Sequence, residues 1–249
     1  MQMLLSIFAF FYRIYFLLII SLTVLLMYPL VYFLLTNRKY FPLLFRVVSL
    51  QAKIVLFLCG IRKNVTFASE LPPPPYVICP NHSSYLDIFL TYAIFPDYFL
   101  FMGKKELGSV PVFNIYFKEM NILVDRRNVK LAHQAFVEAG EEVKKGSSIV
   151  VFPEGTIPAS APVMKAFKNG AFRLAIENQV PIVPVSFKNN YRLMQDSFSF
   201  GAKARPGKSV VYVHPAISTK GMSEADLVNL RQEVRKIIAG KLDEQENQL

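Results

Sequence analysis

The sequence of 249 residues has no tryptophan, two cysteines and three histidines. Cys59 and Cys79 lie in apolar surroundings and are too few for a disulfide framework, so we expect two buried thiols in a reducing compartment. With no cluster of histidines and cysteines at metal-ligand spacing, a zinc site is not expected, and no cofactor is expected either. Charged residues make up 18% of the chain and hydrophobic residues 53%, which excludes an intrinsically disordered tail and a collagen-like repeat.

Acidic residues are also scarce, and the first of them is Glu70. The chain has 28 Lys and Arg against 18 Asp and Glu, which gives a formal net charge of +10. This excess favours an anionic partner: nucleic acid, an anionic lipid surface or a phosphorylated substrate. The mean hydropathy of +0.32 is high for a water-soluble protein and favours contact with a membrane.

The apolar residues are concentrated at the N-terminus. Residues 14–35 form a run of 22 residues without a charge, and a helix of about 20 residues matches the ~30 Å hydrocarbon core of a bilayer. Only Arg13 precedes this run, unlike the basic start of a cleaved signal peptide, so we expect the segment to be retained. Pro29 should kink the helix.

A second apolar stretch, residues 41–61, carries Arg46, Ser49 and Lys53, which fall on one face of a helix and predict an amphipathic helix in the membrane interface. Residues 1–70 would then form an N-terminal hydrophobic two-helix membrane hairpin. The alternative is a buried core hairpin of a soluble protein. The basic residues of the segment suit the anionic cytoplasmic leaflet and predict that the following domain lies on the cytoplasmic side: Arg38, Lys39, Arg46, Lys53, Arg62 and Lys63.

Four consecutive prolines at residues 72–75 force an extended path and predict a linker to a second domain, residues 71–249. Beyond them, β-rich runs alternate with helical stretches, which predicts an α/β fold with a mostly parallel sheet flanked by helices. The predicted strands are residues 76–80, 98–102, 122–125, 148–152, 182–187 and 210–214. The predicted helices are residues 84–94, 129–145, 170–178 and 223–239, the last opened by a capping box at residues 223–226.

Polar residues at the carboxyl ends of these strands are candidate site residues, because ligands bind there in open α/β sheets. After the first strand, Ser84 would be the N-cap of a helix and Asp87 its third residue. The carboxylate could then accept the Nδ1–H of His82 from the preceding turn, which would fix the imidazole tautomer and leave Nε2 free as a general base. The alternative is a simple capping box beside a loop histidine.

A second candidate group is the segment Phe-Pro-Glu-Gly-Thr at residues 152–156, where a strand ends. Gly155 permits a tight turn, and Glu154 stands where a ligand would bind; a solvated turn carboxylate is the alternative.

A third group is basic. Arg126 and Arg127 follow another strand, and Lys165 and Lys168 precede the helix expected to begin at Gly170. Arginine suits bidentate phosphate binding, and a helix N-terminus offers free amides to the same anion. Charged surface turns are the alternative.

These segments together resemble the 1-acyl-sn-glycerol-3-phosphate acyltransferase family of membrane glycerolipid acyltransferases. The resemblance covers residues 76 to about 190 and rests on four pieces in order: His-x4-Asp at 82–87, Asp-Arg at 125–126, Phe-Pro-Glu-Gly-Thr at 152–156 and Val-Pro-Ile-Val-Pro-Val at 180–185. It implies an enzyme that moves a fatty acyl group from acyl-CoA or an acyl carrier protein to the free hydroxyl of 1-acyl-sn-glycerol-3-phosphate. The product, phosphatidic acid, would serve phospholipid synthesis.

The resemblance also implies residue roles. His82 and Asp87 would be the catalytic dyad and Arg126 a ligand of the acceptor phosphate. Residues expected to help bind substrate come from several loops: Glu154, Gly155, Thr156 and Lys168 by the resemblance, and Lys105 as a donor to the oxyanion. Where the family usually continues with Arg and Ser, this chain has Ile157 and Pro158. The acceptor could therefore be another lysolipid, such as a lyso-aminolipid.

Two other readings compete with acyl transfer. A membrane lipid hydrolase would use Ser83 or Ser84 as a covalent nucleophile beside His82, although no Gly-x-Ser-x-Gly elbow occurs. A non-catalytic binder would account for the positive charge, but no recognised nucleic-acid module is present, so no nucleic-acid partner is expected.

Overall fold

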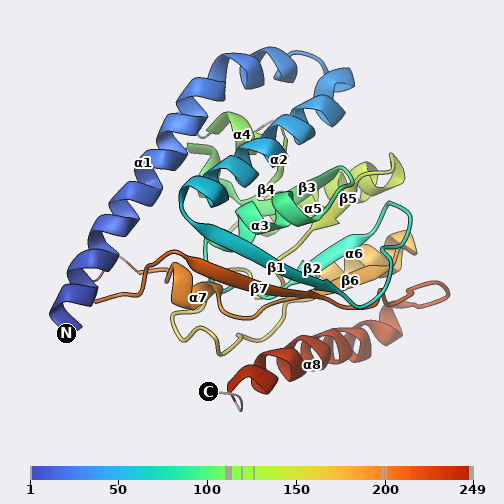
Figure 1. Ribbon diagram of the computed structural model, residues 1–249. Helices are drawn as coiled ribbons and strands as arrows, with labels where there is room; N and C mark the ends of the chain where they lie inside the picture. The colour runs from blue at the N-terminus through green and yellow to red at the C-terminus, as the bar shows by residue number, and fades with distance from the viewer. Residues whose placement is uncertain are drawn as a thin grey trace.

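The computed structural model describes residues 2–109, 114–118, 120–125, 127–197, 199 and 201–246. In this part of the chain, seven strands form one sheet in the order β1-β7-β6-β2-β5-β3-β4 (Figure 1). Neighbouring strands run parallel except β6 and β7, which are antiparallel, so the prediction of a mostly parallel sheet is confirmed. The strands are β1 (Ile61–Phe67), β2 (Val77–Pro80), β3 (Phe99–Lys104), β4 (Ile122–Val124), β5 (Ser148–Val150), β6 (Ile182–Phe187) and β7 (Gly207–Val213).

Helices cover both faces of the sheet, as expected for buried parallel strands. They are α1 (Gln2–Leu35), α2 (Phe41–Leu58), α3 (Leu86–Ile94), α4 (Asn114–Lys118), α5 (Val129–Lys144), α6 (Gly170–Asn178), α7 (Asn190–Leu193) and α8 (Leu227–Glu246). The predicted strand and helix at Ile182–Phe187 and Gly170–Asn178 have the expected bounds. The predicted capping box is present, with Ser223 and Asp226 bonding each other's backbone, but it opens a short 3₁₀ turn ahead of α8.

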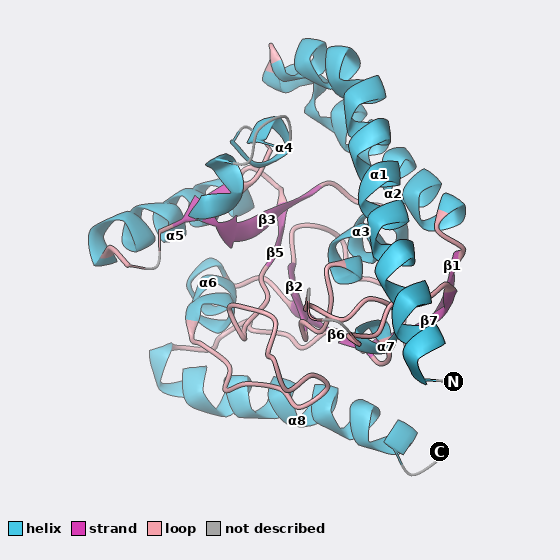
Figure 2. Cartoon of the chain, turned by 90° about the vertical axis from the view of Figure 1, so that its left-hand side faces the viewer, coloured by secondary structure: helices cyan, strands magenta, loops and turns pink. Residues whose placement is uncertain are grey.

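The two faces have separate cores. Alternate residues of β2 point to opposite sides of the sheet: Ile78 packs in the cluster that contains α1, α2 and α3, and Val77 packs in the cluster that contains α5, α6 and α8. Figures 1 and 2 show the same division, with α1, α2 and α3 on one side and α8 on the other. The strands β2, β3, β4, β5 and β6 run in one direction, so their carboxyl ends meet at one edge of the sheet, between these two layers of helices. The strands β1 and β7 run the opposite way.

The strand β1 was not predicted, and it changes the interpretation of the proline run. Residues Ile61–Phe67 pair in parallel with Gly207–Val213 over their whole length. Because β1 lies before the prolines and β2 after them, the prolines connect two strands of one sheet rather than separating a helical part from a sheet.

The helices α1 and α2 pack against each other, and α2 also packs on α3. Pro29 lies inside α1, and Figure 1 shows that α1 bends toward its carboxyl end. By length and composition alone, α1 and the segment Arg38–Leu58 could each cross a membrane. On α2, Arg46 and Lys53 are exposed as predicted, but Ser49 is buried, because it faces the packed side of the helix.

Candidate active site

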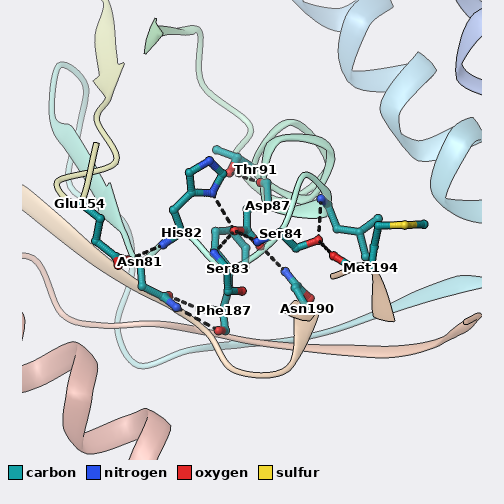
Figure 3. Close-up of polar contacts among 11 residues, drawn as sticks. Asn81, His82, Ser83, Ser84, Asp87, Thr91, Glu154, Phe187, Asn190 and Met194 are labelled. Atoms are coloured by element: carbon teal, nitrogen blue, oxygen red, sulfur yellow. Dashed lines mark hydrogen bonds and ion pairs between the residues drawn. The ribbon is translucent and has the colours of Figure 1, made fainter. Parts of the chain in front are cut away.

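The predicted hydrogen bond between His82 and Asp87 is present at the carboxyl end of β2. The Nδ1 atom of His82 lies 2.9 Å from Oδ2 of Asp87 (Figure 3). Asp87 is fully buried, and the side chain of His82 retains 12% of its exposure. Within the described residues nothing bonds the other ring nitrogen, Nε2. One edge of the imidazole is thus held by the protein and the other is free for a ligand.

The backbone before α3 holds Asp87 in place. Its Oδ2 also accepts hydrogen bonds from the amides of Ser83, at 2.7 Å, and Ser84, at 3.0 Å. The hydroxyl of Ser84 accepts from the amide of Leu86 and donates to the carbonyl of Met194. The helix begins at Leu86 rather than at Ser84, yet these bonds are the capping pattern that the sequence predicts, because Asp87 satisfies amides ahead of the first turn.

A third side chain, which follows the neighbouring strand β6, fixes Asp87. The Nδ2 atom of Asn190, at the start of α7, donates to Oδ1 of Asp87 at 2.7 Å. The Oδ1 atom of Asn190 accepts from the hydroxyl of Ser209 on β7 at 2.6 Å. Asn190 and Ser209 are fully buried. Sequence spacing does not reveal this pair, because the bond joins residues 103 positions apart and no motif surrounds Asn190.

Glu154 is buried and links the end of β5 to the histidine. Its Oε1 accepts from the amide of His82 and its Oε2 from the amide of Lys165, both at 2.8 Å. The alternative of a solvated turn carboxylate is therefore wrong, since only 3% of Glu154 is exposed. Burial raises the pKa of its carboxyl group, against the two amide bonds that favour ionisation.

The ring of Phe152 packs against one face of the imidazole of His82. The two rings are stacked with centroids 3.9 Å apart and an interplanar angle of 18°. Phe152 in turn stacks on Phe101 of β3. With Nδ1 bonded and one ring face covered, His82 has little freedom to rotate, and its Nε2 is held in one direction.

This arrangement can accept a proton from a bound hydroxyl. A neutral imidazole that donates through Nδ1 presents a lone pair on Nε2, and a buried carboxylate stabilises the imidazolium that forms. The hydroxyl of Ser84 is bonded on both sides, which leaves it poorly placed to act as a nucleophile.

Comparison with known proteins identifies the family of this chain. The model of the family described as Acyltransferase matches residues 62–188, about half of the chain. The chain belongs to the acyltransferase family. The 1-acyl-sn-glycerol-3-phosphate acyltransferase of Borreliella burgdorferi is 31% identical to it over 77% of this chain and 76% of that one. The 1-acyl-sn-glycerol-3-phosphate acyltransferase alpha of Mus musculus is 33% identical over 76% of this chain and 66% of that one.

The fold of this acyltransferase also has a solved counterpart. The crystal structure of the 1-acyl-sn-glycerophosphate (LPA) acyltransferase from Thermotoga maritima matches with a TM-score of 0.79 at 24% identity, covering 99% of this chain and 98% of that one. The resemblance drawn from four short motifs is therefore confirmed at the level of family and fold.

The other predicted site residues that the structure describes make fewer contacts with the pair His82 and Asp87. Gly155 makes the expected turn, with φ of 77° and its amide bonded to Phe152. Thr156 and Lys168 are exposed, and the amide of Lys168 bonds the carbonyl of Pro153. Lys105 lies after β3, where its Nζ is 3.2 Å from Oδ2 of Asp125. Arg126 lies outside the described residues.

Proposed function

We propose that this acyltransferase moves a fatty acyl group from an acyl thioester to the free hydroxyl of 1-acyl-sn-glycerol-3-phosphate, giving phosphatidic acid. The observation that carries this proposal is the imidazole of His82, held by Asp87 through Nδ1 and free at Nε2. The names of the relatives supply the substrate, because those proteins are called 1-acyl-sn-glycerol-3-phosphate acyltransferases.

In the proposed reaction, Nε2 of His82 removes the proton from the acceptor hydroxyl as its oxygen attacks the thioester carbonyl. Asp87 stabilises the resulting imidazolium. When the tetrahedral intermediate collapses, the carbon–sulfur bond breaks and the leaving thiolate takes the proton from His82. The nucleophile belongs to the substrate, so the protein needs no nucleophilic serine.

We assign the acceptor phosphate to the basic residues beyond the neighbouring strands. In the sequence Arg126 follows Asp125, the residue after β4, and the carboxylate of Asp125 binds Lys105. Lys168 is exposed two residues before α6, on the segment that leads from Glu154, Gly155 and Thr156. These cations would take the place of the arginine that Ile157 replaces.

The exposed apolar side chains of α1 favour a membrane surface as the place of reaction. Both the acceptor and the product are lipids, so a site next to such a helix can exchange them with the bilayer. The basic residues of the hairpin favour the cytoplasmic leaflet.

Transfer assays with purified protein test the proposal. Acyl-CoA or acyl carrier protein thioesters are supplied with 1-acyl-sn-glycerol-3-phosphate or with other lysolipids, including lyso-aminolipids. We expect phosphatidic acid from the wild type, and a fall in kcat of about 10² to 10⁴ in His82→Ala, because a general base is lost.

The matched control is His133→Ala, which removes an exposed histidine of α5 and should keep wild-type kcat. Near-normal turnover by His82→Ala would exclude His82 as the base. Release of free fatty acid without an acceptor, abolished in Ser83→Ala, would favour a hydrolase instead.

A further inference from the structure

A pocket that His82 does not line lies between the loop before α6 and the first half of α8. It has a volume of about 270 Å³ and is lined by Ala166, Phe167, Arg231, Gln232 and Arg235. Two of these five residues are arginines one helical turn apart, so both side chains lie on the same face of α8. The role of α8 as a cover for the sheet does not require them.

The arginines have no acidic partner within the described part of the chain. The Nη1 atom of Arg231 donates to Oδ1 of Asn169 at 2.5 Å, a neutral acceptor that orients the guanidinium. Arg235 is exposed. Two guanidinium groups beside one cavity, neither neutralised by a carboxylate, favour an anion with several oxygens, such as a phosphate group.

The wall of this pocket is connected to the active site through the backbone. Ala166 and Phe167 stand between Lys165, whose amide binds Glu154, and Lys168, whose amide binds the carbonyl of Pro153. The carboxylate of Glu154 also accepts from the amide of His82. A ligand bound at the pocket would therefore touch a segment that the catalytic loop holds at both ends.

The pocket lies on the side of the sheet opposite to the hairpin. The helix α8 packs in the core that contains α5 and α6, whereas α1 and α2 pack in the other core. In both Figure 1 and Figure 2 the amino-terminal half of α8 lies away from α1. A lipid headgroup would enter from the hairpin side, so this pocket suits a phosphate-bearing ligand that arrives from water.

We propose that the pocket binds the nucleotide phosphates of coenzyme A when acyl-CoA is the acyl donor. The proposal rests on the proposed function and names its donor. The adenosine 3′,5′-bisphosphate end of the donor would bind Arg231 and Arg235, and the pantetheine arm would lead along residues 165–168 toward His82.

The test compares acyl donors with and without the nucleotide of coenzyme A. In Arg235→Gln and in Arg231→Gln/Arg235→Gln, we expect KM for acyl-CoA to rise about tenfold or more, with kcat and KM for the lysolipid acceptor close to wild type. With an acyl-pantetheine donor, which lacks the nucleotide, wild type and variants should have the same KM. The control is Lys236→Gln, which removes one exposed positive charge from the next position of α8.

Three outcomes would overturn the proposal. One is an unchanged KM for acyl-CoA in the double variant, and another is a rise in KM for the lysolipid alone, which would make the pocket an acceptor site. The third is an effect confined to acyl carrier protein donors, which would make it a docking surface for a protein. Thermal unfolding of each variant checks that the fold is intact.

Direct binding of coenzyme A separates this proposal from the proposed function. Calorimetric titration of His82→Ala with coenzyme A should give a Kd about tenfold lower than for the triple variant His82→Ala/Arg231→Gln/Arg235→Gln. If the wild type transfers no acyl group but this difference is found, the proposed function fails and the pocket stands. If transfer from acyl-CoA proceeds and the difference is absent, the pocket fails and the proposed function stands.

Discussion

The carboxylate of Asp87 accepts four hydrogen bonds, and only one of them comes from His82. The other three come from two backbone amides and Asn190, and they fix the carboxylate whether or not the histidine is present. The direction of the imidazole is therefore set by a short turn of backbone and by one side chain of α7. Such support is what holds a catalytic group in a productive geometry.

Asn190→Ala should lower kcat without raising KM for either substrate, because Oδ1 of Asp87 loses the one side-chain donor that the described residues give it and the carboxylate can turn away from His82. An unsatisfied buried acceptor also costs about 1–3 kcal/mol of unfolding free energy. Steady-state kinetics and denaturant unfolding measure the two effects.

Asn189→Ala is the matched control, because Asn189 bonds Lys208 and Val210 of β7 but not Asp87. It should lose stability and keep kcat. If both variants lower kcat equally, Asn190 supports only the fold and does not position Asp87.

Glu154 predicts a pH dependence of stability. Desolvation raises its pKa in the folded protein above the ordinary 4.5, so the folded state holds the proton more tightly than the unfolded chain. The unfolding free energy of the wild type relative to Glu154→Gln should thus be greatest below about pH 4.5 and fall as the pH rises through the folded pKa. Denaturant titrations at a series of pH values measure this difference; a difference that grows with pH would contradict the assignment.

At the residue scale, the pair His82 and Asp87 could be predicted because five positions of sequence fix a turn and the first residues of a helix. Asn190 could not. It lies at the start of a stretch with no clear periodicity, and its bond to Asp87 depends on how β6 and β7 pair. Local spacing reveals groups within one turn, whereas contacts made across a sheet require its topology.

The same contrast holds for whole elements. β6 is buried along its full length and was predicted with its bounds. The sequence pattern does not indicate β1, because only Ile61 of its seven residues is buried and the polar run Arg-Lys-Asn follows Ile61 within the strand. As an edge strand, β1 is specified by its pairing with β7 rather than by an alternation of apolar residues.

The connection between α1 and α2 is tied to α5 by an ion pair, which predicts how firmly the hairpin is held. Arg38 and Lys145 both bond Oε1 of Glu142, at 3.0 and 2.8 Å. Glu142→Gln should speed tryptic cleavage after Arg38 and Lys39 about two- to fivefold, the effect of a solvent-screened ion pair. Glu141→Gln is the control, since among the described residues Glu141 forms its ion pair within α5, with Lys144. Equal cleavage of the two variants would show that the ion pair does not hold the connection.

One contact of α1 and one contact of the turn after it decide how the whole molecule can meet a bilayer. About a third of the way along α1, Arg13 donates to the carbonyl of Lys203 in the loop before β7. Beyond its end, Arg38 bonds Glu142 of α5. From Arg13 to its last residue, Leu35, α1 is about 33 Å long. Contacts at the first residue of this stretch and just beyond its last residue join it to the α/β layers, so no bilayer can separate one end of the stretch from the rest of the protein. We therefore expect the hairpin to lie within one leaflet.

Spin labels on α1 test this arrangement. Leu4 and Leu26 are among its most exposed residues, at 68% and 71%, and lie about 33 Å apart along the helix. In proteoliposomes, lipid-soluble oxygen should enhance the relaxation of nitroxides at both Leu4→Cys and Leu26→Cys, and both labels should lie at depths within one leaflet. A label at Val137→Cys on α5 should instead be relaxed by a water-soluble paramagnetic reagent. The native thiols, Cys59 and Cys79, are buried and should not take the label. Depths in opposite leaflets for the two α1 labels would mean that α1 leaves the α/β layers and spans the membrane.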